Sequence, residues 1–218
     1  MTRTPILMAA VLLSPFCTQI QAAEQDTVLN GCLLTPKTQC PGVDLRGADL
    51  SNLDLTGAVL NGADLRGAKL RHTTLKNADL GKAKLDGANL SRADLRHANL
   101  RGASLVEANL QAINGWALFG QAANFSKANL QGANLEFSRL SKARFHDANL
   151  QAANLEMSWS TKVDMKGANL ANANLQETKM SGANLENADM TGTRKHYANF
   201  MDINMKGCTG CPVDWQKH

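Results

Sequence analysis

The chain has 218 residues, of which 44% are apolar and 19% are charged, and its formal net charge is +4. This length suffices for one domain with a substantial core. The charge is too modest for a protein that binds nucleic acid through its phosphates. Composition excludes little else, so fold and function must be inferred from the order of the residues.

The N-terminal segment has the layout of a secretory signal. Arg3 precedes an apolar run over residues 6–16, and two alanines end the segment. Residues 1–23 are therefore expected to be a signal peptide, whose apolar run is too short to span a bilayer. A lipoprotein signal would use Cys17, but Phe16 occupies the preceding position, where such signals carry a small residue. The protein is expected to be periplasmic or secreted.

Removal of that segment would leave an even number of cysteines, arranged as two pairs at opposite ends of the chain. In an exported protein this pattern favours two disulfides over free thiols. The four residues are Cys32, Cys40, Cys208 and Cys211.

From Val43 to Gly207 the sequence repeats every five residues, as in ADLSN, ADLRG, ANLSR and ANLQG. Leu, Met or Phe occupies nearly every residue number divisible by five, mostly with Ala two residues earlier. Because this period fits neither an α-helix nor a simple strand, the chain must turn a corner once per repeat. Four corners would close a square coil of about twenty residues, and successive coils would stack about 4.8 Å apart. The central apolar residue is replaced at Gly115, Gly120, Ser160 and Lys195.

This pattern resembles the pentapeptide repeat family, A(D/N)LXX, over about three quarters of the chain. The resemblance implies an all-β fold, a right-handed quadrilateral parallel β-helix of about eight coils over residues 43–207. It also implies that the central residue and the one two before it point inward. Small inward residues leave no pocket, so we expect no catalytic site, cofactor or metal. Family members serve unrelated roles, so the fold names no function.

A stack of coils needs a cover at each end, since unpaired edges promote aggregation. Residues 24–42 are expected to form the N-terminal cap, and residues 208–218 the C-terminal cap and tail. Each cap would hold one disulfide, Cys32 with Cys40 and Cys208 with Cys211.

The same cysteines also suggest a zinc site or a redox dithiol. About eight coils at ~4.8 Å would hold the two pairs roughly 40 Å apart, so they cannot share a zinc ion. Cys208 and Cys211 have the spacing of a redox dithiol, but such motifs open a helix beside a sheet. This pair instead ends the repeats, which favours a structural disulfide.

Residues twenty positions apart would stack in one column along such a coil. One column contains Phe119, Arg139 and Trp159, and we expect the guanidinium to lie between the two rings in cation–π contacts. Across one corner, an adjoining column and its neighbours supply further large side chains. We call the whole set the aromatic corner; its members are Trp116, Phe119, Phe137, Arg139, Met157 and Trp159. Tyr197 lies further along the column of Phe137 and is expected to extend this surface.

The two core glycines in this region leave two holes. Ile113 and Leu118, at inward positions, would partly fill them, or Trp116 or Phe119 would fold inward. A shifted register over residues 113–121, with a bulge before residue 125, would instead bury Phe119 and expose Leu118.

Two other departures raise similar questions. Ser160 leaves a smaller gap, toward which Trp159 would turn. Lys195 occupies a central position where a buried charge would be costly, so a local loop is expected there.

Polar residues follow the same columns. The Asp and Asn residues before the central position are expected to form an amide ladder between coils. The histidines show no catalytic constellation and are expected to be solvated surface residues: His72, His97, His146, His196 and His218.

Exposed aromatic residues around an arginine, rimmed by Lys142, Lys162 and Lys179, have the composition of a protein-interface hot spot. We therefore expect a non-catalytic binding module with a protein partner. The specific hypothesis is an immunity or inhibitor protein that neutralises a periplasm-acting toxin or effector.

Three alternatives stay open. The first is a structural scaffold, or a homodimer that buries the aromatic corner. The second is a DNA mimic that protects gyrase, as some family members do, which would need a strongly negative surface. The third is a thiol–disulfide redox protein, which would need Cys208 and Cys211 as free thiols. Neither a nucleic-acid partner nor a membrane span is expected.

Overall fold

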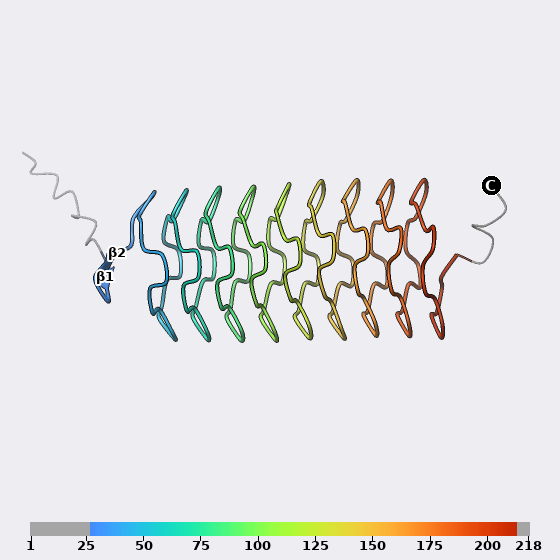
Figure 1. Ribbon diagram of the computed structural model, residues 1–218, viewed down its shortest axis with the longest axis horizontal. Helices are drawn as coiled ribbons and strands as arrows, with labels where there is room; N and C mark the ends of the chain where they lie inside the picture. The colour runs from blue at the N-terminus through green and yellow to red at the C-terminus, as the bar shows by residue number, and fades with distance from the viewer. Residues whose placement is uncertain (1–26, 213–218) are drawn as a thin grey trace, which may run out of the picture.

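The structure is a computed structural model that describes residues 27–212. It is a straight stack of coils, with the N-terminal hairpin at one end and the C-terminal segment at the other (Figure 1). Strands β1 (Val28–Leu29) and β2 (Cys32–Leu33) pair antiparallel in that hairpin. No helix occurs between residues 27 and 212. The expected signal peptide, residues 1–23, lies outside the described residues.

The coils are joined by parallel backbone pairing with a period of twenty residues. Bridges run without interruption from Gln39 with Val59 to Asp189 with Thr209, one bridge on each side of every coil. Each is made by backbone hydrogen bonds along the stack, such as Leu45 N to the carbonyl oxygen of Asp64 at 2.7 Å. The twenty-residue coil with four corners, expected from the five-residue repeat, is therefore confirmed.

Every corner is a two-residue turn whose second residue has a positive φ. Glycine fills this position at Gly57, with φ of 67°, but many other residue types take it, for example Asn52 with φ of 64°. In this left-handed region side chains other than those of Gly, Asn and Asp are disfavoured. The corners therefore hold their side chains in a fixed outward direction at some cost in backbone energy.

The Asp or Asn before the central residue stabilises the following corner. For example, Asp49 Oδ1 accepts a hydrogen bond from the backbone N–H of Ser51 at 3.1 Å, and the same bond recurs along the stack. The expected amide ladder between coils exists at some repeats, as from Asn174 Nδ2 to Asn154 Oδ1 at 2.9 Å. The residue type is thus explained first by the turn, in which a short polar side chain satisfies a backbone N–H.

The core is one continuous column of leucine and alanine. Leu50 and Ala58 are both fully buried, and every inward position from residue 55 to residue 190 is buried. Burying one leucine side chain stabilises the fold by about 1.5–3 kcal/mol. Phe125 and Phe145 replace leucine in adjacent coils and stack face to face, with ring centroids 4.7 Å apart.

Residues 113–121 keep the regular register, so the shifted register was wrong. Phe119 retains its bridges to the coils on both sides, whereas Leu118 is 1% exposed. A Cβ atom built on Gly115 would lie 3.5 Å from Leu118 Cδ1, and one on Gly120 would lie 3.1 Å from Leu118 Cδ2. Leu118, at a position that usually holds alanine, therefore occupies part of both holes together with Leu135 and Leu140 of the following coil, and no bulge is needed.

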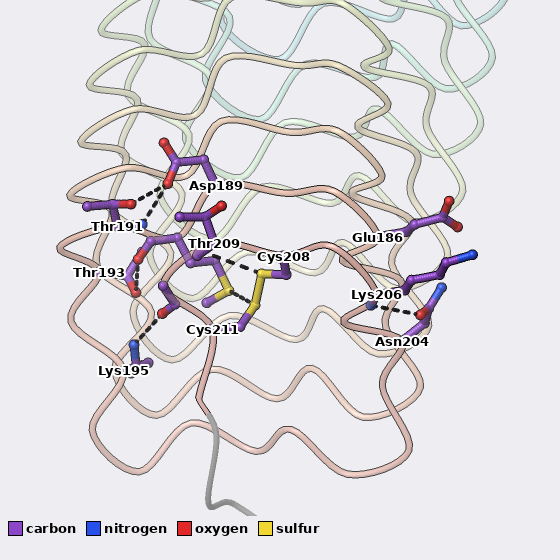
Figure 2. Close-up of a disulfide and its surroundings, with 12 residues drawn as sticks. Glu186, Asp189, Thr191, Thr193, Lys195, Asn204, Lys206, Cys208, Thr209 and Cys211 are labelled. Atoms are coloured by element: carbon purple, nitrogen blue, oxygen red, sulfur yellow. Dashed lines mark hydrogen bonds between the residues drawn. A yellow bond between two sulfur atoms is a disulfide. The ribbon is translucent and has the colours of Figure 1, made fainter.

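The other departures are also absorbed without loss of register. Ser160 is buried and its hydroxyl lies 3.0 Å from that of Ser158, while Trp159 stays 52% exposed and does not turn inward. The loop expected around Lys195 was wrong, because the bridge at Arg194 persists. Lys195 belongs to the last coil and faces the C-terminal segment, where its Nζ donates to the carbonyl oxygen of Gly210 at 2.8 Å (Figure 2).

A disulfide lies at each end of the stack, as expected: Cys32 with Cys40 and Cys208 with Cys211. The second pair packs beneath the last complete coil, with Cys211 Sγ 3.3 Å from Met190 Sδ (Figure 2). The residues that the structure describes contain no group of three or more His, Cys, Asp or Glu placed to hold a metal ion.

Candidate functional site: the aromatic corner

In the described chain, large exposed apolar side chains occur at the two ends of the stack and in its middle. Val28 and Leu33 lie in the N-terminal hairpin, and Tyr197 and Met201 lie in the last coil. Among residues 27–212, Phe137 and Trp159 are the large apolar residues exposed in the middle of the stack, at 41% and 52%. They lie in successive coils, Phe137 in a corner column and Trp159 in the bridge column that follows it. The aromatic corner is therefore a local feature of an otherwise polar rod.

The outward direction of this surface follows from the turn geometry. Phe137 and Met157 occupy the second corner position, with φ of 57° and 54°. A bulky side chain in this region costs roughly 1–2 kcal/mol relative to glycine, and the turn points it away from the core. Asn77 takes the same position in the same column with φ of 57°, so the fold itself does not require an aromatic residue there.

Trp116 and Phe137 contact each other across successive coils. Their ring centroids lie 5.7 Å apart with an interplanar angle of 70°, which is the favourable edge-to-face arrangement. Both residues belong to the aromatic corner, and the structure brings their rings together. His97 adds a third ring, 4.9 Å from that of Trp116 at 86°. Sequence reasoning placed His97 among solvated histidines, although its position one coil before Trp116 was a signal for this contact.

The cation–π contacts differ from the expected sandwich. Arg139 lies over Phe119, with Cζ 5.3 Å from the ring centroid, and Arg101 lies over the same ring at 4.8 Å. The ring of Trp159 is instead covered by Lys179, whose Nζ lies 4.0 Å from its centroid. The column order was right, since Phe119, Arg139 and Trp159 are bridged in sequence. The cation–π contact of Trp159 comes from the coil after it, because a lysine stem reaches back along the column.

A shallow groove lies on the face that follows this corner. It has a volume of about 290 Å³ and is lined by Gln121, Arg139, Ser141 and Trp159. Ser141 holds its neighbour Thr161 through a hydroxyl contact of 2.8 Å. The groove is therefore apolar on one side, cationic on another, and has hydroxyl and amide groups at its base.

Tyr197 lies apart from the aromatic corner. Glu177 separates it from Met157 in the same column, and its ring contacts that of His196, with centroids 3.8 Å apart. It is 78% exposed. Tyr197 therefore forms part of the C-terminal end of the stack, together with Met201.

Some acidic side chains away from this surface have cationic partners. The side-chain hydrogen bond from Arg46 lowers the pKa of Asp44 from 3.8 to about 2. Burial of Asp164 would raise its pKa, but the hydrogen bond and charge of His146, whose Nε2 lies 2.6 Å away, lower it overall. His146 is thus a paired residue, contrary to the expectation of a free surface histidine.

The family of this architecture can now be stated from comparison with known proteins. The family described as pentapeptide repeats matches in eight copies, over residues 39–77, 75–111, 121–156 and 161–207. This chain belongs to the pentapeptide repeat family. The matched ranges leave out residues 112–120 and 157–160, which hold Trp116, Phe119, Met157 and Trp159 of the aromatic corner.

Solved pentapeptide repeat structures are similar to this chain. HetL, involved in heterocyst differentiation regulation in the cyanobacterium Nostoc sp., has 30% identity over 77% of this chain and 89% of its own, with a TM-score of 0.35. QnrB1, a plasmid-mediated fluoroquinolone resistance protein, has 18% identity over 76% and 90%, with a TM-score of 0.46. A protein of the Arabidopsis thaliana thylakoid lumen has 24% identity over 49% and 71%, with a TM-score of 0.27. Among curated proteins, none gives a significant match. Within residues 27–212, no helix is long and apolar enough to cross a membrane.

Proposed function

We propose that this pentapeptide repeat protein is a non-catalytic binding module of the bacterial envelope, which holds a protein partner at the aromatic corner. The observation that carries the proposal is the exposure of Phe137 and Trp159 in adjacent coils of a polar rod. A soluble protein seldom exposes grouped aromatic residues without use. Trp and Arg dominate the energetics of protein interfaces.

The fold suits this role because it presents the corner without reorganisation. The backbone on both sides is held by continuous hydrogen bonds between coils, and Trp116, Phe137 and Trp159 are each held by a ring or a cation. A surface ordered before binding loses little conformational entropy on association.

The envelope location is proposed from two features. Both ends of the described chain carry disulfides, which persist in oxidising compartments. The N-terminal residues have the layout of an export signal. Within this class we favour an immunity or inhibitor protein that neutralises a toxin or effector acting in the periplasm. We also infer that the coil is right-handed, as the resemblance to the pentapeptide repeat family implies.

Other roles fit less well. A DNA mimic needs negative charge in place of phosphates, and the face beside the aromatic corner carries arginine and lysine. A redox role for Cys208 and Cys211 predicts free thiols in the reduced form, so thiol counting under native conditions tests it. A homodimer through the aromatic corner would be reported by light scattering as a lower mass for Trp159→Ala.

The test of the proposed function is capture of partners from the native envelope. The chain supplies mild replacements, since asparagine stands in the same columns at Asn77 and Asn99. The variant Phe137→Asn/Trp159→Asn therefore removes both rings while keeping the turn chemistry. We expect wild type to retain a discrete envelope protein that this variant loses.

A matched control separates surface loss from unfolding. Lys127 and Arg144 occupy equivalent repeat positions on other sides of the coil, and asparagine stands in their columns at Asn187 and Asn124. Lys127→Asn/Arg144→Asn should keep the partner. Identical captured proteins from all three forms would overturn the proposed function.

A further inference from the structure

The face that follows the aromatic corner carries cations without acids. It comprises the bridge column that holds Trp159 and the two corner columns after it. Between residues 99 and 182 these columns contain no Asp or Glu. Their five cations form no ion pair with any residue of the described range 27–212: Arg101, Arg139, Lys142, Lys162 and Lys179. This strip is a basic surface within a chain of modest net charge.

Other arginines of the rod show how a guanidinium group is neutralised by a nearby carboxylate. In Asp-Leu-Arg repeats the arginine turns back onto the aspartate two residues before it. Arg46 donates from Nε and Nη2 to the carboxylate of Asp44, at 2.9 and 2.6 Å, and Arg66 and Arg96 repeat the arrangement. An arginine that follows Asp-Leu is therefore paired with that carboxylate in bidentate geometry.

Arg139 stands at the repeat position of Asp44 rather than that of Arg46, and the columns of this strip offer it no acid. Its guanidinium makes no hydrogen bond to a side chain or backbone group within residues 27–212, whereas Arg101 donates from Nε to Gln121 at 3.2 Å. Contact with the Phe119 ring holds the group in place. A cation–π contact orients a guanidinium while leaving its N–H donors available.

The groove beside Arg139 has room for a carboxylate group. Its volume of about 290 Å³ is bounded by Arg139, by the Trp159 ring, and by Gln121 and Ser141. An apolar wall next to a guanidinium excludes water from one side and strengthens a charge-assisted hydrogen bond there.

We propose that this groove binds a carboxylate from an acidic segment of the partner protein, with Arg139 as the bidentate anchor and the lysines of the strip as flanking charges. The proposal rests on the proposed function and names the chemistry of the partner. The partner's segment combines Asp or Glu with apolar residues, since the carboxylate site adjoins the exposed rings of the aromatic corner.

An acidic protein segment fits this surface better than nucleic acid does. Single-stranded nucleic acids bind by stacking bases on open aromatic faces. Here cations lie over Phe119 and Trp159, so Arg101, Arg139 and Lys179 compete with bases for these ring faces. The column beside them carries neutral Gln121, Ser141 and Thr161, which suit hydrogen bonding to a peptide more than contact with a row of phosphates.

The test uses the folded, disulfide-bonded protein and measures binding by NMR, which detects millimolar affinity. The probe is a six-residue peptide of alternating Glu and Leu with blocked ends, followed through the Arg139 Nε–H and Trp159 Nε1–H signals. The matched peptide with Gln for Glu, and a six-nucleotide thymidine strand, are the comparison ligands. The protein forms are wild type, Arg139→Gln and Arg144→Gln.

Arg144 is the matched control because it shares the repeat position and the coil of Arg139. It too is exposed and forms no ion pair with residues 27–212. Loss of one charge-assisted pair should weaken binding of the acidic peptide about tenfold or more. Arg144→Gln removes the same charge and should change the affinity for the acidic peptide less than about twofold. The Gln peptide should not bind.

Several results would overturn the proposal. These are no shift with the acidic peptide, equal losses in the two variants, or tighter binding of the thymidine strand. If envelope capture is lost in Phe137→Asn/Trp159→Asn but kept in Arg139→Gln, the binding module stands and the carboxylate site fails. If capture is the same in every form while the peptide still binds at Arg139, the proposed function fails instead.

Discussion

Lys179 Nζ lies 4.0 Å from the centre of the Trp159 ring, one coil further along the same column. The contact joins an exposed tryptophan to the regular coil that follows it. Exposed cation–π pairs contribute about 0.5–1 kcal/mol, so the contact orders the ring more than it stabilises the rod.

Removing this cation should therefore affect Trp159 locally. We expect Lys179→Gln to lower the free energy of unfolding by about 0.5 kcal/mol and to broaden the Trp159 indole signal, because the ring gains freedom. Urea unfolding and NMR measure the two effects. Lys142→Gln, at an exposed lysine with no ring partner in the described residues, should change neither, and equal effects from both variants would contradict the contact.

Leu118 is expected to be a sensitive core position because it occupies part of two holes. Leu118→Ala should cost about 2–5 kcal/mol. Gly120→Leu should also destabilise, since even a Cβ atom there would meet Leu140 Cδ2 at 2.9 Å and Leu118 Cδ2 at 3.1 Å. The double variant restores the regular alanine and leucine of the repeat and should recover most of the loss.

The double-variant cycle is measured by urea unfolding. A large favourable coupling between Leu118→Ala and Gly120→Leu is the expected result. Additive losses would show that Leu118 does not occupy the space left by Gly120.

The Asp44–Arg46 pair predicts a dependence of stability on pH. The pKa of Asp44 falls from 3.8 to about 2 in the folded state, chiefly through the side-chain hydrogen bond from Arg46. A depressed pKa contributes stability above the unfolded value and loses it as pH falls through the folded value. This contribution is therefore complete above pH 5 or so and disappears between about pH 4 and 2.

Carboxyl-carbon NMR titration of wild type and Arg46→Gln measures this effect. In the variant the Asp44 pKa should move back toward 3.8. Arg144→Gln is the control and should leave the Asp44 titration unchanged. An Asp44 pKa that stays low in Arg46→Gln would exclude the hydrogen bond as the cause.

Reduction of the two disulfides should loosen the ends and spare the middle. The bonds close short loops, with sequence separations of 8 and 3, and short loops give the smaller entropic stabilisation. Repeat proteins also lose structure locally, coil by coil. Hydrogen exchange after reduction should rise in the hairpin and the last coil, with amides near Leu130 still protected; uniform loss of protection would contradict this.

The fold was predictable because one rule acts at every repeat. Leu50 and Leu55 are successive inward residues, and their spacing of five defines the period without knowledge of distant contacts. The exceptions depended on neighbours in other coils. Whether Leu118 fills the holes or leaves the register is decided by Leu135 and Leu140 in the following coil, which the local sequence does not show.

The candidate site was predictable in position and less so in contacts. The twenty-residue coil placed Trp116 and Phe137, which are 21 residues apart, at neighbouring positions of successive coils, and their rings do contact each other. The columns did not show which long side chain covers which ring, because Lys179 and Arg101 reach along the column by rotamer choice. The column of Tyr197 was right, but Glu177 separates it from the aromatic corner.

Site-specific photo-crosslinking in the intact envelope tests the central claim most directly. A photoreactive phenylalanine analogue replaces Phe137, or Lys127 at the opposite corner; both positions have φ of 57°. A discrete crosslinked protein from position 137 and none from position 127 is the predicted result. No crosslink from position 137, or the same products from both positions, would show that the aromatic corner is not the binding surface.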